Sequence, residues 1–159
     1  MPVAPPQPAL RRLYVWDRIM FSILGLDHVV LRAVNVPHMV RFYCDVLGCT
    51  LERERAAIGL TQLRAGNSLI DLAAVDGEVG PRGGAGPRVD GRNMDHLCLR
   101  IEPFDPGALT AHLIRHGVVP GEIKSRYGAD GQGPSIYISD PEGNTVELKG
   151  PPESRPPAA

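Results

Sequence analysis

The spacing of apolar residues divides the chain into two stretches that follow the same order of elements. In the first stretch, an alternating and β-branched segment over 25–34 predicts a strand. Apolar residues then recur at helical spacing over 36–47, with Pro37 in the first turn and Gly48 as the stop, so a helix is expected there. Three short strands are expected to follow, at 50–55, 58–64 and 68–74.

The second stretch repeats this order. The segment 94–102 predicts a strand, and 105–117 predicts a helix with Asp105 as its N-cap and Gly117 as its stop. Strands are expected at 118–122, 135–139 and 145–149. The βαβββ pattern therefore occurs twice. It predicts an α+β fold in which two tandem modules, 23–75 and 93–150, form one domain over 23–150.

Three other segments lack this periodicity and are rich in Pro or Gly. Residues 1–22 are expected to be a flexible, Pro-rich N-terminal extension, and 151–159 a disordered tail. Gly and Pro dominate 76–92, which is expected to link the two modules.

Each stretch also begins and ends on a related phrase. DHVVLR at 27–32 recurs as DHLCLR at 95–100, with four of the six positions identical. GNSLIDL at 66–72 recurs, with one gap, as GNTVEL at 143–148. Two matching phrases in matching order indicate a duplicated unit rather than chance. Each copy then carries a His on its first strand and a carboxylate on its last.

Strand alternation places these polar residues on one face of each module. Side chains two residues apart share a face, so His28 and His96 lie opposite the apolar residues that pack under a helix. The Asp before each His is expected on the other face, in a structural role. Two such faces brought together form a barrel-like cleft whose four ligands suit a divalent transition ion and balance its charge: His28, Asp71, His96 and Glu147.

Composition and charge exclude several other classes of protein. The chain has 159 residues and a net charge of −1, with Lys and Arg spread along it, so neither a nucleic-acid footprint nor a basic membrane-binding cluster appears. No run approaches the roughly 18 apolar residues that span a bilayer. The 3 cysteines match neither a disulfide framework nor a zinc ribbon, and they are expected to be reduced thiols in a cytoplasmic protein.

These motifs resemble a known family. LDHVVLRAVNVPHMVRFYCDVLG at 26–48 resembles the opening strand and helix of the vicinal oxygen chelate superfamily, and SIYISDPEGNTVEL at 135–148 resembles its closing hairpin. That superfamily includes glyoxalase I, fosfomycin-resistance and bleomycin-resistance proteins, and extradiol dioxygenases. The resemblance covers about 26–150, and 126–144 is most similar to a glyoxalase-domain subgroup.

The resemblance implies a ligand set and a base. His28, His96 and Glu147 match the family's metal-ligand positions. Asp71 falls where glyoxalase I carries a Glu that binds the metal and acts as the base, and Asp is one methylene shorter. Asp71 is therefore either a fourth ligand or only a base beside a set of two His and one carboxylate. Asp71 and Glu147 are the candidate catalytic residues for proton transfer, with Asp71 favoured.

The resemblance further implies a glyoxalase-like lyase or isomerase that uses a divalent metal ion (Zn, Ni, Mn or Fe(II)) for metal-stabilised enediolate chemistry on a small vicinal-oxygen substrate. The alternatives are an extradiol-type dioxygenase using Fe(II), a fosfomycin-type thiol transferase and a non-catalytic drug-binding protein. Glutathione is a possible co-substrate, because Arg32 matches a residue that binds its carboxylate. An anionic substrate is also expected to contact Arg100, Arg126 and Tyr127. A homodimer is expected, although the cleft can close within one chain or across two.

Overall fold

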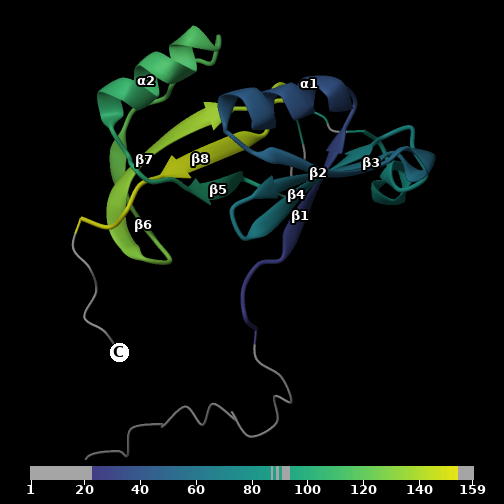
Figure 1. Cartoon of the computed structure of the whole chain (residues 1–159), viewed down its shortest axis with the longest axis horizontal. Helices are drawn as coiled ribbons and strands as arrows, with labels where there is room; N and C mark the ends of the chain where they lie inside the picture. The colour runs from purple at the N-terminus through teal and green to yellow at the C-terminus, as the bar shows by residue number, and fades with distance from the viewer. Residues whose placement is uncertain (1–22, 87, 89, 91–93, 154–159) are drawn as a thin grey trace, which may run out of the picture.

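The fold consists of two four-stranded sheets that lie side by side (Figure 1). The structure is a computed structural model, and it describes residues 23–86, 88, 90 and 94–153. The predicted extension at 1–22 lies outside the described residues. In the first module the strand order is β1-β4-β3-β2, with strands β1 (His28–Ala33), β2 (Thr50–Arg55), β3 (Leu60–Ala65) and β4 (Ser68–Ala74). The prediction of an α+β fold with two modules is confirmed.

The second module repeats this topology with the order β5-β8-β7-β6. Its strands are β5 (His96–Arg100), β6 (Lys124–Gly128), β7 (Gly131–Ser139) and β8 (Thr145–Lys149). The strand predicted at 118–122 is wrong, because β6 begins only at Lys124. Pro120 has no N–H to donate to a strand ladder. The backbone N–H of Gly121 donates one hydrogen bond to the carbonyl of Tyr137.

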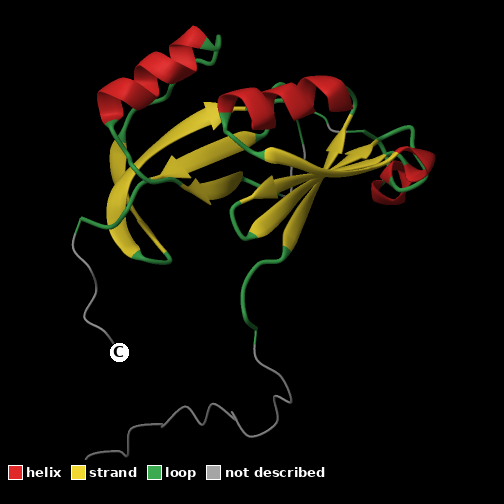
Figure 2. Ribbon diagram, in the orientation of Figure 1, coloured by secondary structure: helices red, strands yellow, loops and turns green. Residues whose placement is uncertain are grey.

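Both principal helices lie on the same side of the two sheets (Figure 2). Helix α1 (Val36–Arg41) continues as a π-helical turn, η1 (Phe42–Val46), and α2 spans Pro106–Arg115. Asn35 and Asp105 cap the two N-termini with their side-chain oxygens, as predicted for Asp105. Two short 3₁₀ turns, η2 (Ala56–Ile58) and η3 (Gly80–Gly83), complete the fold. None of the helices in the described part of the chain has the length and apolar character of a membrane-spanning segment.

The helix-facing sides of the sheets form the core. Buried strand residues such as Leu31, Ile70, Ile136 and Leu148 pack there with Leu113 of α2. Burial of such side chains contributes roughly 1.5–3 kcal/mol each, before the cost of ordering the chain is subtracted. The opposite faces of both sheets have no helix over them, which leaves the polar residues of the repeated phrases on open faces (Figure 2).

Hydrogen bonds connect the two modules through the closing hairpin of the second. The Tyr43 hydroxyl donates to Asp140 Oδ2 at 3.1 Å, and the backbone N–H of Asn35 donates to Glu142 Oε1 at 2.6 Å. Asp140 also accepts from Asn144 and from backbone N–H groups of its own turn. The Asp-Pro-Glu-Gly-Asn turn thus has a structural function, because it attaches the second module to the first helix.

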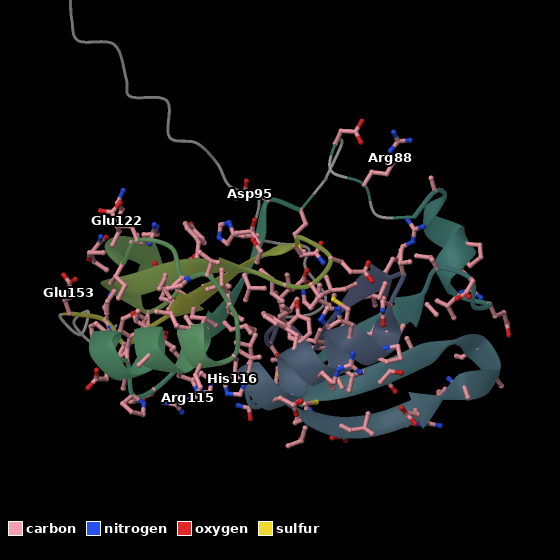
Figure 3. The ribbon with its side chains drawn as sticks, turned by 90° about the horizontal axis from the view of Figure 1, so that it is seen from above. Arg88, Asp95, Arg115, His116, Glu122 and Glu153 are labelled. Atoms are coloured by element: carbon pink, nitrogen blue, oxygen red, sulfur yellow. The ribbon has the colours of Figure 1, made fainter. Side chains whose placement is uncertain are left out.

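Part of the predicted linker and the start of the predicted tail are hydrogen-bonded to the sheets. Arg32 reaches into the linker and donates to backbone carbonyls of the segment 80–85. Residues 151–153, predicted to be disordered, lie along the second sheet, where Glu153 accepts from Ser125 at 2.6 Å (Figure 3). Its backbone N–H also donates to the Gln132 carbonyl. These bonds attach 151–153 to the sheet, and 154–159 lie outside the described residues.

Candidate metal centre

The parallel pairing of first and last strands brings a His next to a carboxylate in each module. Strand β1 runs beside β4, with Val30 opposite Asp71, and β5 runs beside β8, with Cys98 opposite Glu147. Residues that are opposite in a ladder point to the same side of the sheet. Since His28 is two residues from Val30 and His96 two residues from Cys98, each His shares the open face with the carboxylate of its own module.

In the second module the two groups are in contact. His96 Nε2 lies 3.2 Å from Glu147 Oε2, and His96 Nδ1 lies 2.7 Å from Asp95 Oδ2. When Nδ1 carries the proton that Asp95 accepts, Nε2 of a neutral ring presents a lone pair to the carboxylate. The contact becomes favourable when Nε2 carries a proton or when both groups bind one metal ion. Two ligands that each lie about 2.1 Å from one ion are roughly 3.0–3.4 Å apart, so this spacing fits a shared metal.

The first module repeats the Asp–His contact, but His28 and Asp71 are not at ion-pair distance. His28 Nδ1 lies 2.7 Å from Asp27 Oδ1, and this hydrogen bond is the main cause that raises the pKa of His28 above its usual value. The nearby charge of Asp71 raises that pKa further, while desolvation lowers it. Asp71 Oδ2 accepts from Gln62 Nε2 at 2.9 Å, which fixes the orientation of the carboxylate.

Each carboxylate has one buried oxygen with no hydrogen-bond partner. Asp71 and Glu147 are 4% and 5% exposed, and within the described part of the chain Asp71 Oδ1 and Glu147 Oε1 are the buried side-chain atoms without a partner. Leaving such atoms unsatisfied costs several kcal/mol for a charged group unless a cation or a donor compensates. Each module thus has one unsatisfied carboxylate oxygen on the same face as a His, where a cation or a hydrogen-bond donor would compensate it.

The Asp of each repeated phrase is a partner of its His rather than a residue of the opposite face. Asp27 and Asp95 both accept from Nδ1 of the His that follows, so the sequence-based expectation of a separate structural role is wrong. Both Asp side chains precede their strands and are almost fully exposed, so they can turn toward the ring; Figure 3 labels Asp95 before β5. A carboxylate on Nδ1 fixes the tautomer that leaves Nε2 for a metal.

The four predicted ligands form two pairs and not one cluster within the chain. Among residues 23–86, 88, 90 and 94–153, no group of three or more His, Cys, Asp or Glu side chains is close enough to hold a metal ion. The two sheets share no ladder, and the two pairs stay on their own sheets. Within one chain the described residues therefore hold two separate His–carboxylate pairs, one on each sheet.

The predicted substrate-binding residues have different surroundings. Arg32 directs four of its five N–H groups to the carbonyls of Gly80, Gly83, Gly84 and Ala85, at 2.6–2.9 Å, so in this structure it anchors the linker. A contact between Arg32 and a substrate would require these carbonyls to be replaced.

The other three predicted residues belong to the second module. Arg126 shares the open face with Glu147 and lies over the Tyr137 ring, 4.3 Å from its centroid. Arg100 is exposed and forms an ion pair with Asp130. Tyr127 lies next to Arg126 on β6 and therefore points to the opposite face, where it is exposed. The structure thus brings Arg126 to the candidate site and does not bring Tyr127 there.

Several residues of the open faces were not singled out from the sequence. Gln62 holds Asp71, Tyr137 packs against His96 with ring centroids 5.3 Å apart, and Lys149 is buried two residues after Glu147. Cys98 is exposed and lies opposite Glu147; desolvation and the charge of Glu147 raise the pKa of its thiol to about 11. Strand alternation alone places Lys149 on the face of Glu147, but its burial depends on contacts across the sheet.

A separate groove of about 990 Å³ lies between the modules on the helix side. Mainly apolar residues line it, among them Val29, Leu97, Leu99 and Leu109. None of the four predicted ligands is among its described lining residues. The groove does reach the face of Glu147 at one edge, because Cys98 and Arg100 also line it.

Comparisons with known proteins agree with this fold. The model of the Glyoxalase/Bleomycin resistance protein/Dioxygenase superfamily matches residues 25–148. The virulence protein STM3117 of Salmonella typhimurium is 29% identical over 83% of this chain and 88% of its own length, and its crystal structure superposes with a TM-score of 0.69 over 82% of this chain and 99% of that one. The glyoxalase domain-containing protein RDO1 of Mycosarcoma maydis is 32% identical over 80% of this chain and 68% of its own length.

More distant structures share the fold alone. A lactoylglutathione lyase from Agrobacterium tumefaciens is 17% identical with a TM-score of 0.58, covering 80% of this chain and 94% of that chain.

Proposed function

Because this chain belongs to the Glyoxalase/Bleomycin resistance protein/Dioxygenase superfamily, we propose that it is a divalent-metal-dependent lyase or isomerase acting on a small substrate with two adjacent oxygens. The observation that carries this proposal is the pair of buried carboxylate oxygens without partners, Asp71 Oδ1 and Glu147 Oε1. Each lies in a module whose His is oriented by a carboxylate on Nδ1.

We propose further that the complete site forms between two copies of the chain. The module-one pair of one copy, His28 and Asp71, would meet the module-two pair of the other, His96 and Glu147. A symmetric dimer of this kind holds two equivalent sites, each with two imidazoles and two carboxylates. The support is the absence, among the described residues of one chain, of any cluster that contains three of these groups.

A bound divalent ion would act as a Lewis acid toward the adjacent substrate oxygens. The chain's own residues would supply the proton transfer. Asp71 is the candidate base, because Gln62 occupies its Oδ2 and leaves Oδ1 free to accept or return a proton. Glu147 already contacts His96 and would serve mainly as a metal ligand, with proton transfer as its second candidate role.

Metal analysis of the purified chain, followed by turnover with the reconstituted protein, tests this proposal. We expect about one Zn, Ni or Mn ion per chain and metal-dependent conversion of a vicinal-oxygen substrate, with glutathione hemithioacetals as the first compounds to assay. Stoichiometric Fe(II) with oxygen uptake would favour the dioxygenase alternative, and metal-dependent addition of a thiol to an epoxide would favour the transferase. Absence of stoichiometric metal would contradict the proposal and favour a drug-binding protein.

The cytoplasmic location inferred from the cysteines remains a prediction. Cys44, Cys49 and Cys98 are free thiols in the structure, and Cys49 is buried.

A further inference from the structure

A buried ammonium group lies on the same open face as the module-two pair. Lys149 is 5% exposed, and its Nζ donates to the carbonyls of Arg126 at 2.5 Å and Gly133 at 3.2 Å. Within the described part of the chain it has no carboxylate partner at ion-pair distance. A buried cation without a counter-charge is costly, so an anion is expected beside it when the protein performs its function.

The sheet leaves space for this side chain at a glycine. A Cβ added to Gly128 would lie 2.6 Å from Lys149 Cε and 3.0 Å from its Cδ. The absence of a side chain at Gly128 therefore lets the Lys149 stem cross the sheet from β8 toward β6. The position of the ammonium group therefore depends on a residue of β6, two strands away in the sheet.

Arg126, whose carbonyl accepts from Lys149, carries a second cation on the same face. Arg126 Nη1 donates to the Ser135 carbonyl at 3.0 Å and to Ser135 Oγ at 2.8 Å. The guanidinium has five N–H groups, so these two bonds leave further donors for a ligand. Arg126 also covers the ring of Tyr137, and Tyr137 in turn contacts the ring of His96. Direct contacts therefore connect the cations to the candidate metal ligand.

Charges on this face are strongly asymmetric. The strand positions that share a side with Glu147 include four cationic residues and no second carboxylate, by the register of the sheet. Two of the four, Arg100 and Lys124, are exposed and pair with Asp130 and Glu122. Lys149 and Arg126 are the two without such a partner among the described residues, and they are also the more buried.

We propose that Lys149 and Arg126 bind an oxyanion of the substrate, a carboxylate, phosphonate or phosphate group, at the opposite end from the metal-binding oxygens. That the substrate's other end carries metal-binding oxygens rests on the proposed function. Two strand spacings of about 4.8 Å separate β8 from β6, which places the oxyanion on the order of 10 Å from the metal. The substrate would then be an anionic compound several bonds long, with adjacent oxygens at one end.

Binding of inorganic phosphate to the full-length chain tests the oxyanion site without knowledge of the substrate. Isothermal titration is run at constant ionic strength, with chloride as the comparison anion, on both the metal-free and the metal-loaded protein. We expect saturable phosphate binding that Lys149→Met weakens at least tenfold, the loss expected for one hydrogen bond to a charged group. Lys124→Met, on the same face but paired with Glu122, should change the affinity less than twofold.

Gly128→Ala provides a variant that retains every charge. Its new Cβ would displace the Lys149 stem, so phosphate affinity should again fall about tenfold or more although net charge is unchanged. This variant decides the question if Lys149→Met fails to fold. The proposal is overturned if the wild type shows no saturable phosphate binding, or if neither Lys149→Met nor Gly128→Ala weakens it.

The two proposals fail separately in this experiment. Phosphate binding that depends on Lys149 in a chain that binds no metal would support the oxyanion site and contradict the proposed function. Stoichiometric metal, together with phosphate binding that neither variant weakens, would support the proposed function and contradict the oxyanion site.

Discussion

His96 Nε2 faces Glu147 Oε2 at 3.2 Å while Asp95 holds the other nitrogen of the same ring. The ring is therefore positioned from both sides, by a carboxylate that orients it and by one with which it would share a cation. The first module repeats the first half of this relationship with Asp27 and His28.

Asp95→Asn should weaken metal binding by about tenfold to a hundredfold, because it removes the carboxylate that orients the His96 ring. The ligand set itself is untouched, so stoichiometry should stay the same while the dissociation constant rises. Competition with a chelator of known affinity measures this change. Glu54→Gln, an exposed carboxylate on β2, is the matched control and should have no effect. Equal affinities for Asp95→Asn and the wild type would remove Asp95 from the site.

In the metal-free protein, Cys98 should react slowly with iodoacetamide near neutral pH, because desolvation and the Glu147 carboxylate raise the pKa of its thiol to about 11. Only the thiolate is nucleophilic, so the rate should rise with pH until the pH reaches that value. Glu147→Gln removes the charge that opposes ionisation, so the pKa falls and alkylation accelerates. Mass spectrometry of the Cys98 peptide follows the reaction separately from Cys44 and Cys49. A rate that is independent of Glu147 would contradict this contact.

Tyr43→Phe should lower the free energy of unfolding by about 1–3 kcal/mol, because it removes a buried hydrogen bond to Asp140 and leaves that oxygen with one partner fewer. The hydroxyl is buried, and desolvation together with the charge of Asp140 raises its pKa well above the usual value, so it remains protonated as a donor. Urea denaturation measures the change. Metal affinity should be unaffected, since this bond joins the modules at a distance from both His–carboxylate pairs. Unchanged stability would show that the hairpin contact is dispensable.

Arg32→Lys should release the linker, because an ammonium group has three donors and cannot reproduce the fork that reaches Gly80, Gly83, Gly84 and Ala85. Amide hydrogen exchange in 80–85 should accelerate about tenfold or more, while exchange in the second module stays as it was. If the linker exchanges equally fast in both proteins, the Arg32 contacts do not hold it.

Much of this architecture could be predicted from the sequence because the relevant patterns are local. The strands at Thr50–Arg55, Ser68–Ala74 and Thr145–Lys149 have the predicted bounds, and the cap and stop of the second helix are those expected. The strand placed at 118–122 failed because its apolar residues suggested a strand where Pro120 and Gly121 interrupt the ladder. Short apolar runs around such residues are ambiguous by spacing alone.

The candidate site was predicted less completely, for reasons of three-dimensional contact. Alternation identified which face His96 and Glu147 share, but the turn of Asp95 toward the ring occurs before the strand begins, where alternation gives no guidance. The capture of Arg32 by the linker and the burial of Lys149 over Gly128 are contacts between distant segments. Whether two half-sites meet within a chain depends on how the sheets are arranged, which no local pattern specifies.

The most direct test of the central claim is metal binding by a mixed dimer. One variant carries His28→Ala and Asp71→Asn, the other carries His96→Ala and Glu147→Gln, and each alone should bind no stoichiometric metal. The two chains are co-expressed with different tags, and the mixed dimer is purified through both. If each site joins module one of one copy to module two of the other, the mixed dimer regains one intact site and binds one metal ion. A mixed dimer that binds no metal, beside a wild type that does, would contradict a site shared between two copies.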